Sequence, residues 1–202
     1  MTREELAELH YITPIENVPS ILEHGILSNR RARRFGPKSI AKQEVQDLRA
    51  KVRVPGGRPL HEYANLYICA RNPMMYVRRG LHSETCVLRV STDLLDLRGV
   101  IVTDQNAASD YRRFMPSPDG LAMVDASMVF ADDWRHPNDQ AAFWRHRSVM
   151  CAEVLVPDSV PPGFVTGAYV SGATARTALG ACAPALPSTV NAHMFFQGGG
   201  RP

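Results

Sequence analysis

The stretch of sequence that most constrains the fold is VMCAEVLVPD, residues 149–158. Its β-branched and apolar residues favour a buried strand, and the final Pro-Asp pair is a typical turn signal that ends it. Because side chains alternate between the two faces of a strand, Glu153 and Leu155 share one face while Val154 lies on the other. The pattern therefore places a carboxylate among apolar neighbours on a rigid element.

This carboxylate has two interpretations, because a buried glutamate is unfavourable unless something pairs with it. In the first, the strand lies at a sheet edge or turns this face to water, where most glutamates are found. In the second, Glu153 is a catalytic carboxylate on the floor of a cleft. The strand alone does not decide between them.

The length and composition of the chain limit the class of protein to which it can belong. With 202 residues, 45% hydrophobic and 21% charged, it fits one globular domain with a sizeable core. No apolar run approaches the roughly 20 residues of a membrane span, and the N-terminus lacks an apolar signal core, so we expect a cytoplasmic protein without membrane contact. Four scattered cysteines and seven scattered histidines show no metal-ligand spacing, so no metal site or disulfide framework is predicted.

Positive charge is concentrated in one segment. Residues 30–58 hold ten lysines and arginines against two acidic residues, although the net charge of the chain is only +3. Such an excess attracts phosphate in nucleic acid or in a dinucleotide, and a solvated basic surface is an equally good interpretation. A helix capped by Ser39 is predicted in this segment, with Arg49 at the margin of its apolar face (positions 41, 45 and 48) and able to reach into a cleft.

The remaining elements follow from periodicity and from turn signals. Strands are predicted at 10–13, 65–70, 85–91, 100–103, 166–171 and 188–196. Further helices are predicted at 17–25, at 72–80, after Asp104 and near 173–180. Residues 28–38 are expected to form an exposed loop, 116–148 an irregular segment, and 198–202 a flexible tail after a domain at 1–197. Strands that do not alternate regularly with helices favour a single-domain α+β fold.

Common nucleotide-binding and hydrolase signatures are absent. The chain has no GxGxxG after a strand, no glycine-rich loop ending in GKS or GKT, and no GxSxG elbow. What remains is a glutamate on a strand, an arginine in a basic segment, and a polar N-terminal strand.

Ordered motifs connect these three features. They are HYITPIEN (10–17), ILEHGILS (21–28), SIA (39–41) leading to Arg49, LHEY (60–63), YICARNPMMY (67–76) and AEVLV (152–156). In this order, over nearly the whole chain, they resemble the DarT family of DNA ADP-ribosyltransferases, toxins paired with a macrodomain antitoxin called DarG.

The resemblance implies a fold and an activity. The expected fold is an ADP-ribosyltransferase-like split β-sandwich with flanking helices around a cleft for NAD. The expected reaction transfers ADP-ribose from NAD, as co-substrate and without a metal, to a base in single-stranded DNA. The base is thymine in the best known branch and guanine in another. A DarG-like macrodomain antitoxin is the expected partner.

The resemblance also assigns residues. Glu153 matches the catalytic glutamate and Arg49 the catalytic arginine. The residues expected to bind NAD are His10, Tyr11, Thr13, Asn17, Tyr67, Met74 and Tyr76. The residues expected to meet the DNA are Asn106, Trp134, Arg145 and Arg147. In two places the chain departs from the family pattern.

The departures concern histidines. The family usually has an aromatic residue followed by histidine before Ile-Thr, whereas here the order is His10-Tyr11, so Tyr11 takes the histidine's place. A second family histidine is replaced by Asn106. These differences leave the target base open.

The expected chemistry gives each catalytic residue a task. Cleavage of the nicotinamide glycosidic bond creates an oxocarbenium-like ribose, which a carboxylate near the 2′-hydroxyl can stabilise. The planar guanidinium of Arg49 suits the pyrophosphate or the base under attack, and its alternative role is a structural ion pair. The other functions to be weighed are the same chemistry on guanine or on RNA, and a catalytically silent module that only binds nucleic acid.

Overall fold

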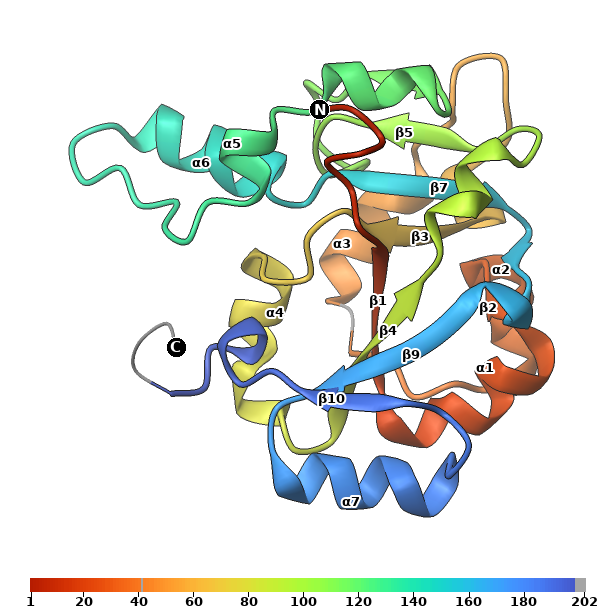
Figure 1. Cartoon of the computed structure of the whole chain (residues 1–202). Helices are drawn as coiled ribbons and strands as arrows, with labels where there is room; N and C mark the ends of the chain where they lie inside the picture. Colours follow the sequence, from red (N-terminus) through yellow and green to blue (C-terminus); the bar gives the residue numbers. More distant parts are fainter. Residues whose placement is uncertain (41, 199–202) are drawn as a thin grey trace.

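One sheet of eight strands runs through the part of the chain that the structure describes, residues 1–40 and 42–198 (Figure 1). In this computed structural model the strand order is β10-β9-β4-β1-β3-β7-β5-β6, and a separate pair joins β2 to β8. The strands are β1 (Leu9–Pro14), β2 (Ile26–Leu27), β3 (Tyr63–Tyr67), β4 (Thr85–Val90), β5 (Ile101–Thr103), β6 (Phe114–Pro116), β7 (Glu153–Pro157), β8 (Ser159–Val160), β9 (Val165–Val170) and β10 (Ser188–Val190). All neighbours are antiparallel except β9 and β10.

The sheet is narrowest where β1 meets β3. These strands pair only at His10 and Tyr67, whereas β1 pairs with β4 along its whole length and β3 pairs with β7 along its own. Two four-stranded halves, β10-β9-β4-β1 and β3-β7-β5-β6, therefore join at one point and diverge beyond it. This divided sheet confirms the predicted α+β fold with a split β-sandwich, and matches the solved structures described below.

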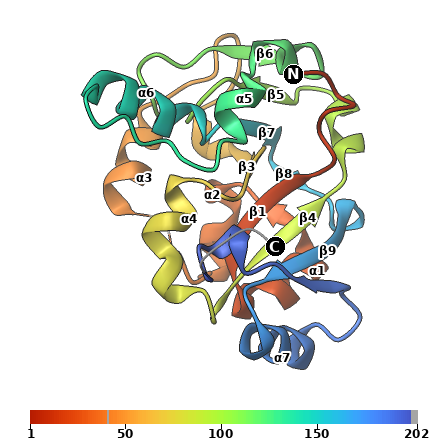
Figure 2. The same ribbon diagram turned by 60° about the vertical axis from the view of Figure 1, so that its left-hand side comes forward.

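Helices cover both faces of the first half-sheet. The α-helices of the described residues are α1 (Val18–His24), α2 (Asn29–Ala32), α3 (Gln43–Ala50), α4 (Pro73–Arg78), α5 (Ala126–Val129), α6 (Gln140–Val149) and α7 (Ala173–Cys182). Helices α1 and α7 pack in the largest core cluster with residues of β1, β4 and β9. On the opposite face, Met75 of α4 and Phe195 pack against Ile12 and Val87. Figure 2 shows α3, α4 and α6 gathered on the side where β1 and β3 diverge.

Strand β7 has the predicted alternation. Leu155 packs in a small cluster with Val52, Val54 and Leu60. On the other face, Val154 and Val156 belong to the large core. Glu153 and Leu155 therefore share one face, as predicted. The strand begins only at Glu153, however, because Val149 ends α6 and residues 150–152 connect the helix to the strand.

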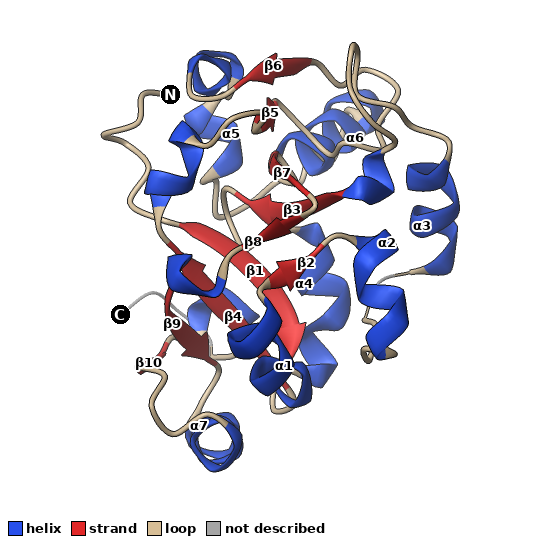
Figure 3. Ribbon diagram, turned by 90° about the vertical axis from the view of Figure 1, so that its right-hand side faces the viewer, coloured by secondary structure: helices blue, strands red, loops and turns tan. Residues whose placement is uncertain are grey.

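Local signals located two helix boundaries correctly. Gly25 follows α1 with φ of 87°, a backbone conformation that a side chain would strain. The side chain of Asn72 caps α4 by accepting a hydrogen bond from the backbone N–H of Met75 at 3.0 Å. Figure 3 shows α1 below the β2–β8 pair, and α2 to one side of the pair with α3 beyond it.

Other predicted elements were wrong. Residues 28–38 are not an open loop, because Ser28 caps α2 and a 3₁₀ turn follows at Arg33–Phe35. Helix α3 begins at Gln43, flanked by Lys42 rather than capped by Ser39, and position 41 lies outside the described residues.

Two further predictions need correction. The helix expected after Asp104 is a series of turns followed by β6, and the segment 188–196 divides into β10 and the 3₁₀ turn His193–Phe195. The predicted tail, beyond Gly198, lies outside the described residues. Within those that are described, no helix is long and apolar enough to cross a bilayer.

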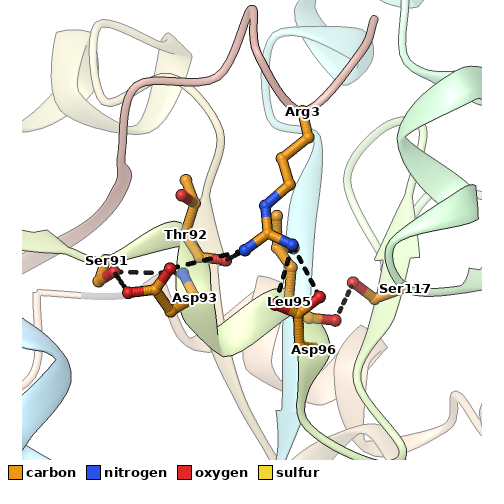
Figure 4. A network of polar contacts seen from close by, with 7 residues as sticks. All are labelled: Arg3, Ser91, Thr92, Asp93, Leu95, Asp96 and Ser117. Carbon is orange, nitrogen blue, oxygen red and sulfur yellow. Dashed lines mark hydrogen bonds and ion pairs between the residues drawn. The ribbon is translucent and has the colours of Figure 1, made fainter.

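The N-terminal segment is fastened to the second half-sheet by ion pairs and hydrogen bonds (Figure 4). The guanidinium of Arg3 donates to both carboxylate oxygens of Asp96, at 2.7 and 2.9 Å, and to the carbonyl of Thr92. Thr92 and Asp96 belong to the 3₁₀ turn Thr92–Asp96, and Ser117, just after β6, donates to the carbonyl of Leu95 in that turn. These contacts hold the edge of the sheet near β5 and β6 in place.

Candidate active site

Arg49 and Glu153 meet where the two half-sheets diverge. Nη1 of Arg49 donates to Oε1 of Glu153 at 2.9 Å, and Nη2 donates to Oε2 at 3.0 Å. Arg49 is only 6% exposed and Glu153 is fully buried. The carboxylate is therefore neither at a solvent-facing edge nor unpaired, which excludes the exposed-glutamate interpretation.

Backbone groups hold Glu153 from the other side. It is the first residue of β7, opposite Tyr67 on β3 and opposite Thr103 on β5. Its N–H donates to Oγ1 of Thr103 at 3.1 Å, and its Oε1 also accepts from the backbone N–H of Ala107 at 3.2 Å. The carboxylate thus accepts three hydrogen bonds, two from Arg49 and one from the N–H of Ala107. Its position is therefore fixed and its rotational freedom is small.

Burial and the ion pair shift the pKa values of Arg49 and of two neighbouring residues. Burial lowers the pKa of Arg49, but the adjacent Glu153 carboxylate raises it by more, so the pKa lies above its ordinary value. Burial, and then Glu153, raise the pKa of Tyr67 well above its usual range and that of Cys151 to about 12. The only permanent cation in contact with the carboxylate, among the described residues, is thus Arg49.

A cleft of about 800 Å³ opens beside this pair. Its walls come from β1, β3, α3, α4, α6, the segment 36–40 and Lys42. Six basic side chains and no acidic ones are among the described residues that line it. The basic residues are Arg33, Lys38, Lys42, Arg49, Arg78 and Arg147. A concave surface of this sign favours an anionic ligand such as a phosphate ester.

The basic segment is tied to the first half-sheet by Asn17. Its Nδ2 donates to the carbonyl of Lys38 at 2.9 Å, and its Oδ1 accepts from the N–H of Lys38 at 3.2 Å. The same amide donates to Oγ1 of Thr13 on β1. This reciprocal clasp places the chain at 36–40 as one wall of the cleft.

Comparison with known proteins fits this arrangement. A family model described as "DarT: ssDNA thymidine ADP-ribosyltransferase, DarT" matches residues 10–196. This chain belongs to the DarT family. It is 35% identical over 173 residues to a DNA ADP-ribosyl transferase–DNA ADP-ribosyl glycohydrolase fusion protein of Thermosipho africanus, a match that covers 81% of this chain and 42% of the fusion protein. A DNA ADP-ribosyl transferase of Thermus sp. is 29% identical over 147 residues, covering 67% of this chain and 70% of that protein.

Solved structures of DarT proteins share the fold. Thermosipho africanus DarTG, solved in complex with ADP-ribose, superposes with a TM-score of 0.81 at 28% identity, covering 94% of this chain and 51% of that one. Thermus sp. DarT in complex with ADP-ribosylated ssDNA gives a TM-score of 0.79 at 23% identity, covering 96% and 99%. This DarT family member therefore spans about half the length of the fusion protein and nearly all of the Thermus protein.

Most of the predicted site residues of this DarT family member lie in the cleft. Eight of them line it, and Glu153 lies directly behind Arg49. The eight are Tyr11, Thr13, Asn17, Arg49, Tyr67, Met74, Asn106 and Arg147. Tyr11 faces the same side of β1 as Thr13, in line with the reversed His-Tyr order. The structure thus brings together residues from five separate segments of the sequence.

His10 does not line the cleft. It lies on the other face of β1 from Tyr11, where its ring nitrogens contact the carbonyl of Ile68 at 3.2 Å and Oε1 of Glu8 at 3.3 Å. Its 8% exposure and these two partners correct its expected placement beside NAD. The alternation of a strand puts adjacent residues on opposite faces, so His10 and Tyr11 were not both able to face the ligand.

Tyr76, Trp134 and Arg145 also lie outside the cleft lining. The rings of Tyr76 and Trp134 form an edge-to-face cluster with Phe196, with centroids 5.1 to 5.8 Å apart. The guanidinium of Arg79 lies 4.1 Å from the Tyr76 centroid. This cluster joins α4, the chain after α5 and the C-terminal segment. The contacts of its members and of Arg145 with NAD and DNA stay predictions from the resemblance.

The sequence also offers Trp144, with Trp134 and Phe143, as a ring on which an unpaired base could stack, and Trp144 lines the cleft. Trp144 is 63% exposed and lines the cleft one helical turn before Arg147 and Ser148 on α6. Spacing of three and four residues was the available signal, because it places these side chains on one helix face. His61 and Asn65 also line the cleft and were not selected from the sequence. His61 lies within the LHEY motif, whereas Asn65 belongs to no pattern that distinguishes it from other polar residues.

Proposed function

We propose that this DarT family member transfers ADP-ribose from NAD to a base in single-stranded DNA, with thymine as the favoured base, and that it acts as a toxin. The observation that carries the proposal is the buried bidentate pair of Arg49 and Glu153 beside a basic cleft. A buried ion pair contributes little net stability, so its retention in a cleft wall needs a functional reason.

The residues of the cleft fit NAD. Its volume lies within the range of small-molecule sites, and its basic walls suit a pyrophosphate. Tyr11 and Tyr67 offer aromatic surface next to the carboxylate, and Asn17 and Thr13 offer polar groups along β1. Arg78 and Arg147 also line the cleft and suit phosphates of a nucleic acid strand.

In the proposed reaction the bond between C1′ of the ribose and nicotinamide breaks, and nicotinamide leaves with the bonding electrons. A bond forms between C1′ and a nitrogen of the DNA base, which releases its proton. Glu153 stabilises the positive charge that develops on the ribose. Each of its oxygens already accepts a bond from Arg49, so Arg49 turns toward the pyrophosphate or the base to free one oxygen.

The relatives support this assignment. Thermus sp. DarT has been solved with NAD+ and with ADP-ribosylated ssDNA, and the Thermosipho protein joins a transferase to a glycohydrolase. The family description names thymidine. From the fusion we infer a macrodomain antitoxin of the DarG type as the partner, and a cytoplasmic location remains a prediction from the sequence.

The test is incubation of purified protein with NAD and single-stranded oligonucleotides of defined base composition, followed by mass spectrometry. We expect one added ADP-ribose on thymine-containing strands and none with the matched control Glu153→Gln. Addition confined to strands that contain guanine, or to RNA, would move the same chemistry to another substrate. Binding of oligonucleotides without any mass increase would support a non-catalytic nucleic-acid module.

The toxin role has its own test. Expression in bacteria is expected to stop growth, and Glu153→Ala is expected to restore it at equal protein level. Equal toxicity of the variant would show that catalysis is not the cause. Co-expression with a macrodomain glycohydrolase is expected to relieve the wild-type effect.

A further inference from the structure

Asn65 occupies a distinctive place on the cleft floor. It lies on β3, on the same face as Tyr67 and two residues before it, which separates their Cα atoms by about 6.7 Å along the strand. Tyr67 is opposite Glu153 and Asn65 is opposite Leu155 across the β3–β7 ladder. Asn65 is half-buried and lines the cleft. Its amide therefore lies near the point at which the two half-sheets diverge.

The other asparagines of the cleft use their side chains within the protein. Four asparagines line the cleft: Asn17, Asn29, Asn65 and Asn106. Asn17 clasps the basic segment, Asn29 donates to Gln46 of α3, and Asn106 accepts from a backbone N–H two residues on. Within the described residues, Asn65 alone of the four makes no side-chain hydrogen bond. The half-buried amide of Asn65 is therefore available to pair with a group that enters the cleft.

We propose that Asn65 is a substrate-reading residue whose amide pairs with an amide-type edge, that is, a hydrogen-bond donor and acceptor side by side on the bound substrate. A primary amide offers one carbonyl acceptor and two N–H donors in a plane, which matches such an edge with two parallel hydrogen bonds. The inference rests on the proposed function and names the group that the site recognises.

Two parts of the substrates carry this edge. One is the carboxamide of nicotinamide in NAD, and the other is the hydrogen-bonding edge of the DNA base. In the proposed reaction both are bonded in turn to the same ribose carbon, which Glu153 stabilises. A residue on the strand next to Glu153 is therefore suitably placed to read either one. Phosphates, by contrast, are served by the six basic residues of the lining.

The test uses two variants. Asn65→Leu removes both hydrogen-bonding groups at nearly constant volume, and Asn65→Asp keeps the shape and the acceptor but removes the donor. Calorimetric titrations with NAD and with ADP-ribose, which lacks nicotinamide, give two affinities, and the KM for a single-stranded oligonucleotide gives the third quantity. Thr189→Val is the control, because it removes an exposed polar group on β10, in the other half-sheet. Thermal unfolding without ligand checks that each variant is folded.

The outcomes separate the two sources. If Asn65 reads the carboxamide, Asn65→Leu weakens NAD binding by roughly 5- to 30-fold and leaves ADP-ribose binding unchanged. If it reads the base, NAD binding is unchanged and the KM for the oligonucleotide rises by a similar factor. No change in any of the three quantities, or an equal loss for NAD and ADP-ribose, overturns the proposal. A wild-type protein that binds no NAD overturns the proposed function and this assignment with it.

Discussion

Arg49 of α3 and Glu153 of β7, 104 residues apart in the sequence, form a buried two-point ion pair at the junction of two half-sheets. Removing one partner of a buried pair leaves the other charge uncompensated, which typically costs about 3–5 kcal/mol. We expect Arg49→Met and Glu153→Gln each to lower the free energy of unfolding by an amount of this order. The double variant is expected to lose much less than the sum. A double-mutant cycle by urea unfolding measures this coupling, and additive losses would contradict it.

Thr103 holds Glu153 through its backbone. Its hydroxyl accepts from the N–H of Glu153 and donates to the carbonyl of Gln105 at 2.8 Å, in the turn that brings the Ala107 N–H to the carboxylate. Thr103→Val is expected to lower kcat about tenfold with little change in the KM for NAD, because the carboxylate loses its fixed position. Thr103→Ser keeps the hydroxyl and is expected to restore kcat. Equal rates for valine and serine would show that the hydroxyl has no positioning role.

Trp144 offers an exposed ring at the cleft next to Arg147. Stacking of one unpaired base on an aromatic ring contributes about 1–3 kcal/mol. Trp144→Ala is therefore expected to raise the KM for single-stranded DNA by roughly 5- to 150-fold. Affinity for NAD should stay the same. Phe130→Ala is the control, since Phe130 is 45% exposed but does not line the cleft. Similar effects of the two variants on KM would argue against base stacking at Trp144.

Glu8 makes the fold sensitive to acid. Burial raises its pKa, but hydrogen bonds with His10, Arg89 and Tyr169 lower it by more, from 4.5 to about 2. A carboxyl whose pKa is lower in the folded state stabilises the fold above pH 4.5, and this contribution is lost as the pH falls toward 2. Glu8→Gln is expected to flatten the dependence of unfolding free energy on pH in this window. An unchanged slope would contradict the assignment.

Features that depend on neighbours in the sequence were predictable. The alternation around Glu153, the glycine after α1 and the Asn72 cap each follow from local backbone geometry, and the structure has all three. Helix α3 shows where such reasoning fails. It buries Arg49 and leaves Leu48 53% exposed, because this helix faces a cleft rather than the core. The periodicity of apolar residues does not distinguish a helix that faces a cleft from one that faces the core.

Contacts between distant segments were beyond sequence patterns. The pairing of Arg49 with Glu153 depends on how α3 lies over β7, and a periodic pattern gives no distance between them. Tyr76 lies outside the cleft because Phe196, 120 residues later, packs on its ring. The order of the family motifs supplied what periodicity did not, and most of the site residues assigned from the resemblance line the cleft.

The central claim is that the Glu153 carboxylate, held by Arg49, drives cleavage of NAD for transfer to DNA. The most direct measurement is the rate of nicotinamide release from NAD in the presence of single-stranded DNA, compared between wild type and Glu153→Gln at equal folded concentration. The account predicts release in the wild type that is matched by ADP-ribose on the DNA, and at least a hundredfold slower release in the variant. Equal release by the two proteins would contradict the account.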